Sequence, residues 1–404
     1  MILIILTIWY RFLVDSSPSR GTGVTVDHEH RPHLFYYSAD KLIHSYWTEN
    51  GWQREKVCSS ASYNNGGPAA EIDRWSRIHV AFFDSAENLS YGVWENGIWL
   101  IETVDTIKPS GDYCDLAIDQ NQIPHIVYHR GSYLAYAVKT QSGWRIKTFI
   151  SEVGGYSPSI EIDDQNHPHI TDCTLWGDLR YLHFDGTNWR IEKPVIGNAG
   201  AHNSLVLDNF NLPKISVYWT GSGRYDLRFV QKESNSWQIY VVDSGGQFSK
   251  KGWSNKIVKD NRGLLHIAYH CHNECLLKHA EGYDSTWVTE VIDTIGGWNA
   301  SISIAIDDAL YIGYCDENNW VWLAVTKNLP SVAEKKDNLI GNEATLINGK
   351  ILASGRVRIF DSMGREVVDG NFPIPRWITI SSSGIFFIVA KGKVKKILVI
   401  KEGP

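Results

Sequence analysis

The stretch that decides the fold is residues 159–171, which read Ser-Ile-Glu-Ile-Asp-Asp-Gln-Asn-His-Pro-His-Ile-Thr. A short strand pattern ends at Asp163, a turn follows, and His169 opens a second strand pattern six residues after the Asp. The six copies of this spacing are Asp27 to His33, Asp73 to His79, Asp119 to His125, Asp163 to His169, Asp208 to Lys214 and Asp260 to His266. We expect a seventh copy at Asp307, with a turn two residues shorter and Tyr311 in the His place. Such a repeat has to be explained before any other feature.

Each copy continues with two further predicted strands. The third strand has a Leu-x-aromatic pattern, as at Leu89 and Tyr91, and a tryptophan opens the fourth. These tryptophans are Trp52, Trp99, Trp144, Trp189, Trp237 and Trp287. The seventh copy lacks one, but residues 9–15, Trp-Tyr-Arg-Phe-Leu-Val-Asp, match residues 237–243 in position and character. We therefore expect residues 8–16 to supply the missing outer strand of the last unit.

Four strands in about 45 residues, joined by Gly-Gly or Pro-Ser turns, are typical of a β-propeller blade. The sequence predicts an all-β protein with a seven-bladed β-propeller at residues 1–329, the Asp-ending strand innermost and the Trp strand outermost. A solenoid would need capping repeats, and units this short are too small to be separate domains. The five repeated histidines are expected to be structural, because a residue that each turn requires recurs with the turn.

Composition supports the all-β prediction and excludes some classes of partner. The chain has 17 Trp, 19 Tyr and 13 Phe beside only 2 Met, a mixture suited to strands. Residues 1–330 contain 27 Lys and Arg against 38 Asp and Glu, a net charge of −11. This charge argues against nucleic acid as a partner. No apolar run is long enough for a membrane span, and no cofactor-binding motif occurs, so neither is expected.

The C-terminal residues differ in kind. Residues 338–404 follow an expected linker at 330–337 and lack the repeat. They contain Val-Arg-Ile-Phe-Asp-Ser-Met-Gly-Arg-Glu-Val at 357–367, Ser-Gly-Ile-Phe-Phe at 383–387 and Lys-Lys-Ile-Leu-Val-Ile-Lys at 395–401. These motifs resemble the C-terminal sorting domain of the bacterial type IX secretion system, a small immunoglobulin-like β-sandwich. The Pro-Asn-Pro opening of that family is missing, and another immunoglobulin-like accessory module is the alternative.

The resemblance implies a cellular location for the protein. It implies that residues 338–404 engage the type IX secretion machinery, that the tail is removed, and that the propeller is extracellular or held at the outer cell surface. The apolar residues 1–8 lack a basic region and a small-x-small cleavage site, so a signal peptide is not clearly present. In an oxidising compartment the six cysteines could pair, and Cys271 with Cys275 is the expected disulfide.

Candidate ligand-binding residues come from one face. In a propeller, the loops between the second and third strands of a blade and the loops leading to the next inner strand surround the same funnel. The aromatic and polar residues expected there are Tyr113, Tyr156, His202, Tyr218, Trp219, Trp253, His272 and Trp298. Aromatic rings stack on flat sugar faces. The sequence therefore predicts a secreted or cell-surface binding protein for a polysaccharide or surface glycan.

A glycan-degrading enzyme is the alternative prediction. The stretches at 125–130 and 260–272 resemble repeats of propeller polysaccharide lyases. This resemblance implies that His129 or His270 would move the proton while Arg130 neutralises a uronate. A zinc site at His270, Cys271, His272, Cys275 and His279 is not expected, because the spacing is wrong and neighbouring strand residues face opposite sides.

Overall fold

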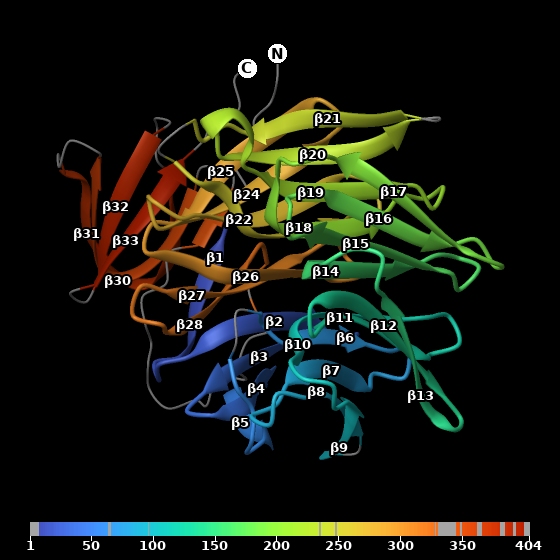
Figure 1. Ribbon diagram of the computed structural model, residues 1–404. Helices are drawn as coiled ribbons and strands as arrows, with labels where there is room; N and C mark the ends of the chain where they lie inside the picture. The colour runs from blue at the N-terminus through green and yellow to red at the C-terminus, as the bar shows by residue number, and fades with distance from the viewer. Residues whose placement is uncertain are drawn as a thin grey trace. The chain divides into compact units, whose positions relative to one another are not determined.

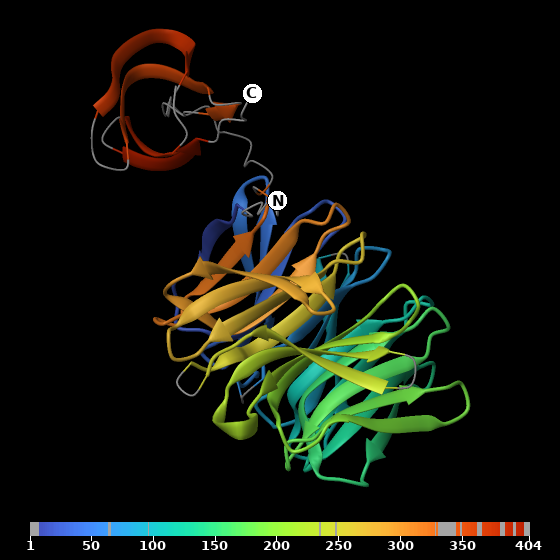
Figure 2. The ribbon, with the colours of Figure 1, turned by 90° about the horizontal axis from the view of Figure 1, so that it is seen from above.

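The computed structural model describes residues 8–63, 66–95, 97–233, 236–246, 249–327, 329, 345–347, 350–361, 366–379, 384–390 and 393–399. The chain divides into two compact units, Met1–Ala333 and Glu334–Pro404. The described residues of the first unit form seven four-stranded antiparallel sheets (Figures 1 and 2). The prediction of a seven-bladed, all-β propeller is confirmed.

The blades follow one another along the chain, each running from its innermost to its outermost strand. Blade 1 is β2 (Arg20–Val26), β3 (Pro32–Ser38), β4 (Lys41–Thr48) and β5 (Gly51–Cys58); blade 2 is β6 (Ala69–Ile72), β7 (Ile78–Phe83), β8 (Leu89–Glu95) and β9 (Ile98–Asp105); blade 3 is β10 (Ser110–Ile118), β11 (Pro124–Arg130), β12 (Tyr133–Thr140) and β13 (Gly143–Phe149). Blade 4 is β14 (Gly154–Ile162), β15 (Pro168–Thr174), β16 (Leu179–Phe184) and β17 (Trp189–Val195); blade 5 is β18 (Ala199–Leu207), β19 (Pro213–Trp219), β20 (Asp226–Glu233) and β21 (Ser236–Asp243), with the short 3-10 helix η1 (Gly221–Gly223) after β19. Blade 6 is β22 (Lys251–Lys259), β23 (Leu265–Cys271), β24 (Leu276–Tyr283) and β25 (Thr286–Asp293); blade 7 is β26 (Gly296–Ile304), β27 (Leu310–Asp316), β28 (Val321–Val325) and β1 (Tyr10–Asp15).

The repeated Asp and His hold the turn between the first two strands of a blade. The Asp27 carboxylate accepts hydrogen bonds from the backbone N–H groups of Glu29 at 2.9 Å and Arg31 at 2.8 Å, as short Asp side chains do in turns. In blade 4 the His169 ring lies between the Asp163 carboxylate at 3.5 Å and the Tyr181 hydroxyl at 2.5 Å. Burial lowers the pKa of His169 to about 4, so the ring is neutral at pH 7. These contacts agree with the expected structural role.

The seventh turn differs from its prediction. The backbone bonds that close it run from Ala305 N–H to Ala309 C=O at 2.8 Å and from Asp308 N–H to Ala305 C=O at 3.0 Å. Ala305 therefore occupies the place of the repeated Asp, and Tyr311 follows six residues later as in the other blades. The expectation of a turn shortened by two residues was wrong. Asp307 lies inside the turn, where it forms an ion pair with Lys327.

Neighbouring blades share two recurring hydrogen bonds across their seams. In the first, the indole N–H of an outer-strand tryptophan donates to a glutamate on the outer strand of the preceding blade, as in Trp99 to Glu55 at 2.8 Å. In the second, a buried tyrosine hydroxyl donates to the aspartate that ends the preceding outer strand, as in Tyr128 to Asp105 at 2.7 Å. Apolar side chains of both blades fill the space between the sheets.

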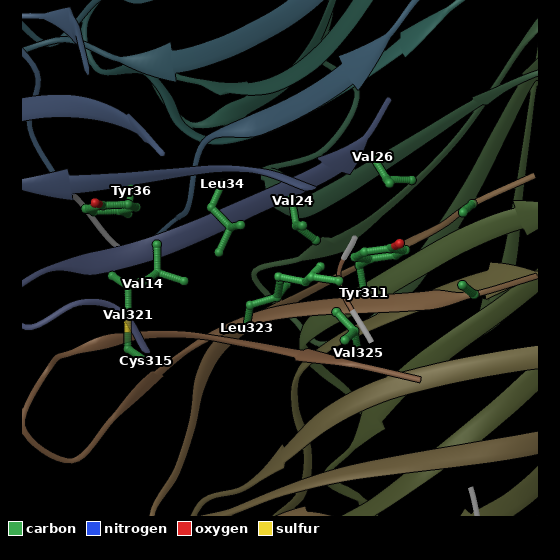
Figure 3. Close-up of a cluster of buried hydrophobic side chains, with 13 residues drawn as sticks. Val14, Val24, Val26, Leu34, Tyr36, Tyr311, Cys315, Val321, Leu323 and Val325 are labelled. Atoms are coloured by element: carbon green, nitrogen blue, oxygen red, sulfur yellow. The ribbon is translucent and has the colours of Figure 1, made fainter. Parts of the chain in front are cut away.

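Strand β1 closes the ring with the same two bonds. It pairs antiparallel with β28, Tyr10 opposite Val325. Trp9 donates to Glu290 of blade 6 at 2.8 Å, and Asp15 accepts from Tyr36 of blade 1 at 2.8 Å. Figure 3 shows Val14 among buried side chains of β2, β3, β27 and β28, the first and last segments of the propeller.

Among the described residues, the seam between blades 3 and 4 lacks the tyrosine–aspartate hydrogen bond. Strand β13 ends at Phe149 rather than at an aspartate, and Asp172 replaces the seam tyrosine on β15. Asp172 is fully buried and takes its counter-charge from Arg180 of the same blade, whose Nε lies 2.9 Å from Oδ1. The backbone N–H of Gly155 also donates to this carboxylate at 2.6 Å. The buried charge is thus paired and hydrogen-bonded, which such a group requires.

The described part of the second unit is an antiparallel sheet of β29 (Thr345–Ile347), β30 (Lys350–Asp361), β31 (Glu366–Thr379), β32 (Gly384–Ala390) and β33 (Lys393–Val399). Strand β30 lies between β31 and β32. The expected linker at 330–337, the Gly-Arg turn at 364–365 and the apolar segment at 1–7 fall outside the described residues. In the part of the chain that is described, no helix is both long and apolar enough to cross a membrane.

Removing β1 tests the closure. Deletion of residues 1–16 takes away the fourth strand of blade 7 and both seam bonds, and leaves β28 as an unpaired edge. We expect a lower melting temperature in calorimetry and aggregation in size-exclusion chromatography. As a milder control, Tyr36→Phe removes only the hydroxyl that bonds Asp15 and Ser45 and should cost about 2 kcal/mol while the protein stays monomeric. A deletion variant that melts like the parent and remains monomeric would contradict the closure.

Candidate functional site

The inner strands of blades 4, 6 and 7 begin with the same irregular backbone. Gly155, Gly252 and Gly297 have φ angles of 97°, 95° and 116°. The residue two positions after each glycine also has a positive φ. The strand registers shift at these points, as in a bulge that re-aims a side chain. The residue after each glycine is aromatic: Tyr156, Trp253 and Trp298. A Cβ at Gly155 would lie 3.1 Å from the His129 ring, and one at Gly297 would lie 3.1 Å from the His270 ring.

Tyr113, His129 and Tyr156 come together at the seam of blades 3 and 4, and we call them the blade 3–4 cluster. The His129 ring stacks on Tyr156 with centroids 5.4 Å apart, and Tyr113 lies edge-on to both rings at 6.5 and 6.3 Å. Asp112 orients the histidine, with Oδ1 2.8 Å from Nδ1. A carboxylate, an imidazole and two phenol groups therefore meet in one place. Burial raises the pKa of Tyr113 to about 12, so its hydroxyl stays protonated at pH 7.

A larger aromatic group spans blades 5 to 7, and we call it the blade 5–7 cluster. Its members are His202, Tyr218, Trp253, His270, His272 and Trp298. Trp253 is central, with ring centroids 4.6 Å from His202, 5.6 Å from Tyr218 and 5.0 Å from His272. Trp298 lies 4.4 Å from His270 and 4.8 Å from His272. Trp253, Trp298 and His272 are partly exposed, so a ligand can reach their rings.

His270 differs from its blade 3 counterpart His129. Both follow the repeated Asp position by ten residues, and both pack on a glycine and an aromatic ring of the next blade. His129 has Asp112 as a partner, whereas the residue at the corresponding place in blade 6 is Trp253. His270 is fully buried, and neither ring nitrogen has a hydrogen-bond partner among the described residues. Burial, followed by the neighbouring His272 and His202, lowers the pKa of His270 to about 3.

Two expected site residues point to other partners. The Arg130 guanidinium is bound to Asp105 and donates to the Thr148 hydroxyl at 2.7 Å, so it belongs to the seam of blades 2 and 3. Trp219 is covered by the Arg228 guanidinium, 3.9 Å from its ring centroid. Neither residue joins the two clusters. The other expected residues, Tyr113, Tyr156, His202, Tyr218, Trp253, His272, Trp298, His129 and His270, lie within them.

The cysteine prediction was wrong. Cys271 and Cys275 are both free thiols. Cys271 is buried at the end of β23, while Cys275 lies in the following hairpin turn and is 3.8 Å from the His272 carbonyl oxygen. Among the described residues, no group of three or more His, Cys, Asp or Glu side chains is arranged to hold a metal ion.

A central cavity of about 330 Å³ lies between the inner strands, and Tyr113 and His202 are among the residues that line it. Further along its wall are Glu71, Asp115, Glu161 and Lys256. The Lys256 ammonium is 3.4 Å from Asp115. Both carboxyls face the cavity, where the surrounding walls reduce their solvation and the carboxylates repel one another, and the pKa of Glu71 and that of Glu161 rise to about 8. Sequence analysis missed this group; its signal was a charged residue in each of four inner strands, β6, β10, β14 and β22.

Comparison with solved structures finds proteins that share the propeller fold. No family model and no curated protein matches the chain. Virginiamycin B lyase from Staphylococcus aureus aligns with a TM-score of 0.55 and 11% identity, covering 78% of this chain and 98% of that one. A polysaccharide lyase, an ulvan lyase bound to GlcA(1-4)Rha3S, aligns with a TM-score of 0.53 and 14% identity, covering 78% and 95%. At these identities the similarity shows the propeller fold alone.

The cavity carboxyls predict a specific pH dependence. A carboxyl with a pKa of about 8 in the folded protein and its ordinary 4.5 in the unfolded chain keeps its proton only when folded, so the free energy of unfolding falls as pH rises from 4.5 to 8. Glu71→Gln and Glu161→Gln remove this loss. Urea unfolding should show both variants more stable than the parent at pH 9, with a smaller gain at pH 5. Glu49→Gln, at an exposed turn, is the control, and identical pH profiles for all four proteins would refute the effect.

Proposed function

We propose that the propeller binds carbohydrate through the face that carries the two aromatic clusters. The observation that carries this proposal is their convergence: residues from Tyr113 to Trp298, contributed by five blades, meet at three seams beside the central cavity. Partly exposed Trp and Tyr rings offer flat apolar faces for the C–H faces of sugars. The neighbouring imidazole and phenol groups can hydrogen-bond sugar hydroxyls.

The form of the ligand follows from the form of the face. The clusters lie at separate seams, so the site is extended rather than a single deep pocket. Such a surface suits a polysaccharide or a surface glycan, which offers several sugar rings, better than a lone monosaccharide. The ulvan lyase with the same fold is bound to a saccharide, so the fold is compatible with a ligand of this class.

A polysaccharide lyase is the second candidate, favoured by the Asp112–His129 pair. A carboxylate 2.8 Å from an imidazole nitrogen orients the ring for proton transfer, and Tyr156 stacks beside it. Arg130, the cation expected to neutralise a uronate, does not face His129, because its guanidinium is bound to Asp105. Passive binding therefore remains the first proposal.

Alanine variants of the cluster aromatics test the binding proposal. Trp298→Ala and Tyr156→Ala each remove one stacking surface and should weaken binding to a responsive polysaccharide about tenfold or more, measured by calorimetry against a polysaccharide panel. Trp75→Ala is the matched control, because Trp75 is an exposed tryptophan (58%) in the blade 2 Asp turn at the opposite end of the inner strand. Equal affinities for all variants, with unchanged melting temperatures, would contradict the proposal.

The same panel separates binding from catalysis. A lyase produces an unsaturated uronate, whose ultraviolet absorbance rises with time. If the protein is a lyase, His129→Ala or His270→Ala should abolish this rise and spare binding. If it binds passively, the absorbance stays flat and His129→Ala changes affinity only.

We also propose that residues 338–404 direct export through the type IX secretion system and place the propeller outside the cell or on its outer surface. The motifs at 357–367, 383–387 and 395–401 support this assignment. The net charge of +5 for residues 331–404, against −11 for the rest, marks the segment as distinct in composition.

A reporter fusion tests whether residues 338–404 direct export. Residues 330–404 fused to a reporter that carries a signal peptide, in a bacterium with type IX secretion, should lead to export of the reporter and removal of the tail. The measurement is immunoblotting of culture medium and periplasm. The same fusion in a strain without the secretion machinery is the control, and intact fusion retained in the periplasm of both strains would refute the assignment.

A further inference from the structure

The part of the rim that blades 5 and 6 contribute to the blade 5–7 cluster reverses the charge of the propeller. Asp226 is shared by Arg224 at 3.8 Å and Arg228 at 3.1 Å, and Asp243 is shared by Lys251 at 3.2 Å and Lys278. Each aspartate therefore leaves one positive charge uncompensated. On blades 5 and 6 the charged groups are the cations Arg224, Arg228, Lys250, Lys251 and Lys278 and the anions Asp226, Asp243 and Glu274. The blade 7 part of the rim carries Asp316 and Glu317 instead, next to Gly296 and Ile295. The local surplus of cations beside Trp253 lies in a propeller whose net charge is −11.

Lys250 is the cation placed to meet a ligand. Its ammonium lies 5.7 Å from the Trp253 ring centroid and 5.8 Å from that of Tyr225, within cation–π range. It forms no ion pair with any described residue, unlike its neighbour Lys251. The backbone N–H of His272 donates to the Lys250 carbonyl at 3.0 Å, which ties the lysine to the cluster. Lys250 is partly exposed, so its three N–H donors are open to a ligand.

The blade 3–4 cluster has the opposite character. Asp112 lies against His129, with its Oδ1 2.8 Å from Nδ1, and no lysine or arginine among the described residues pairs with Asp112. A ligand carboxylate or sulfate would be repelled there and attracted at Lys250. The two clusters therefore differ in the charge they accept, although both present aromatic rings.

We propose that the blade 5–7 cluster binds an acidic sugar unit, with the sugar ring on Trp253 and its carboxylate or sulfate oxygens accepting hydrogen bonds from the Lys250 ammonium. This inference rests on the proposed function and makes it specific. The glycan that the protein selects carries uronate or sulfate groups, and a neutral chain of the same backbone binds less tightly. The aromatic stacking supplies affinity for both chains, and Lys250 supplies the preference.

The test compares charge-matched saccharides. Polyglucuronate, polygalacturonate and polymannuronate are each measured beside their carboxyl-reduced forms, and a sulfated galactan beside its desulfated form, by calorimetry with the full chain. We expect the acidic form of at least one pair to bind about tenfold tighter, with a preference that shrinks as salt rises. Whether the uronate or the sulfate pair responds identifies the anion.

Lys250→Met keeps the alkyl stem and removes the charge, so it should abolish the preference and bring the affinity for the acidic form down to that for the neutral form. Lys147→Met is the matched control, because Lys147 also lies over an aromatic ring, Phe149 at 5.4 Å, but on outer strand β13. A second readout is the pKa of His272, which burial and then the Lys250 charge lower. An anion at Lys250 should raise this pKa in an NMR titration.

The outcomes separate the two proposals. Equal binding of acidic and neutral forms, unchanged by Lys250→Met but lost in Trp253→Ala, overturns the acidic preference and leaves the proposed function standing. A preference that persists in Lys250→Met also overturns the role of Lys250. Binding of no saccharide by the folded protein refutes the proposed function itself.

Discussion

A buried tyrosine hydroxyl on one blade meets the aspartate that ends the previous blade's outer strand at four seams: Tyr36 with Asp15, Tyr128 with Asp105, Tyr269 with Asp243, and Tyr314 with Asp293. The rest of the structure depends on these seams, because each blade is a small sheet that buries its faces only against its neighbours. A hydrogen bond to a buried charged group also fixes where the two sheets meet.

The candidate site is a consequence of the same geometry. Each aromatic cluster begins where the end of one blade's second strand meets the start of the next blade's inner strand, as with His129 on Tyr156 and His270 on Trp298. The seams thus position the rings, and the bulge at the inner strand sets the direction of the aromatic side chain that follows its glycine. The two clusters differ in charge, because Asp112 lies at the blade 3–4 cluster and Lys250 lies beside the blade 5–7 cluster.

Much of the fold could be predicted because the repeat consists of residues only a few positions apart in the sequence. The six turns that begin at the repeated Asp, five of them ending in His and one in Lys214, and the Trp strands are local patterns, and Trp9 could be recognised as a displaced copy. The seventh turn was misjudged because Asp307 resembles the repeated Asp, whereas the backbone bonds place Ala305 there. Local spacing also gave no reason for Cys271 and Cys275 to stay apart.

The site was only partly predictable, for a different reason. Loop topology indicates which residues share a face, and the aromatic residues expected there did converge, apart from Trp219. It does not indicate which partner a charged or flat side chain will choose, so the capture of Arg130 by Asp105 and the cover of Trp219 by Arg228 were unforeseen. The cavity carboxyls come from three separate inner strands, Glu71, Asp115 and Glu161, and only closure of the ring brings them together.

The pairing of Tyr10 with Val325 orders events during synthesis. The first strand of the propeller leaves the ribosome before any blade exists, and its partner β28 is the last propeller strand to be made. Blade 7 and its seams to blades 6 and 1 can therefore form only when the whole propeller has been synthesised. Contacts so distant in sequence are slow to form, so the growing chain spends its synthesis time as an open arc whose two ends each expose a face that closure later buries.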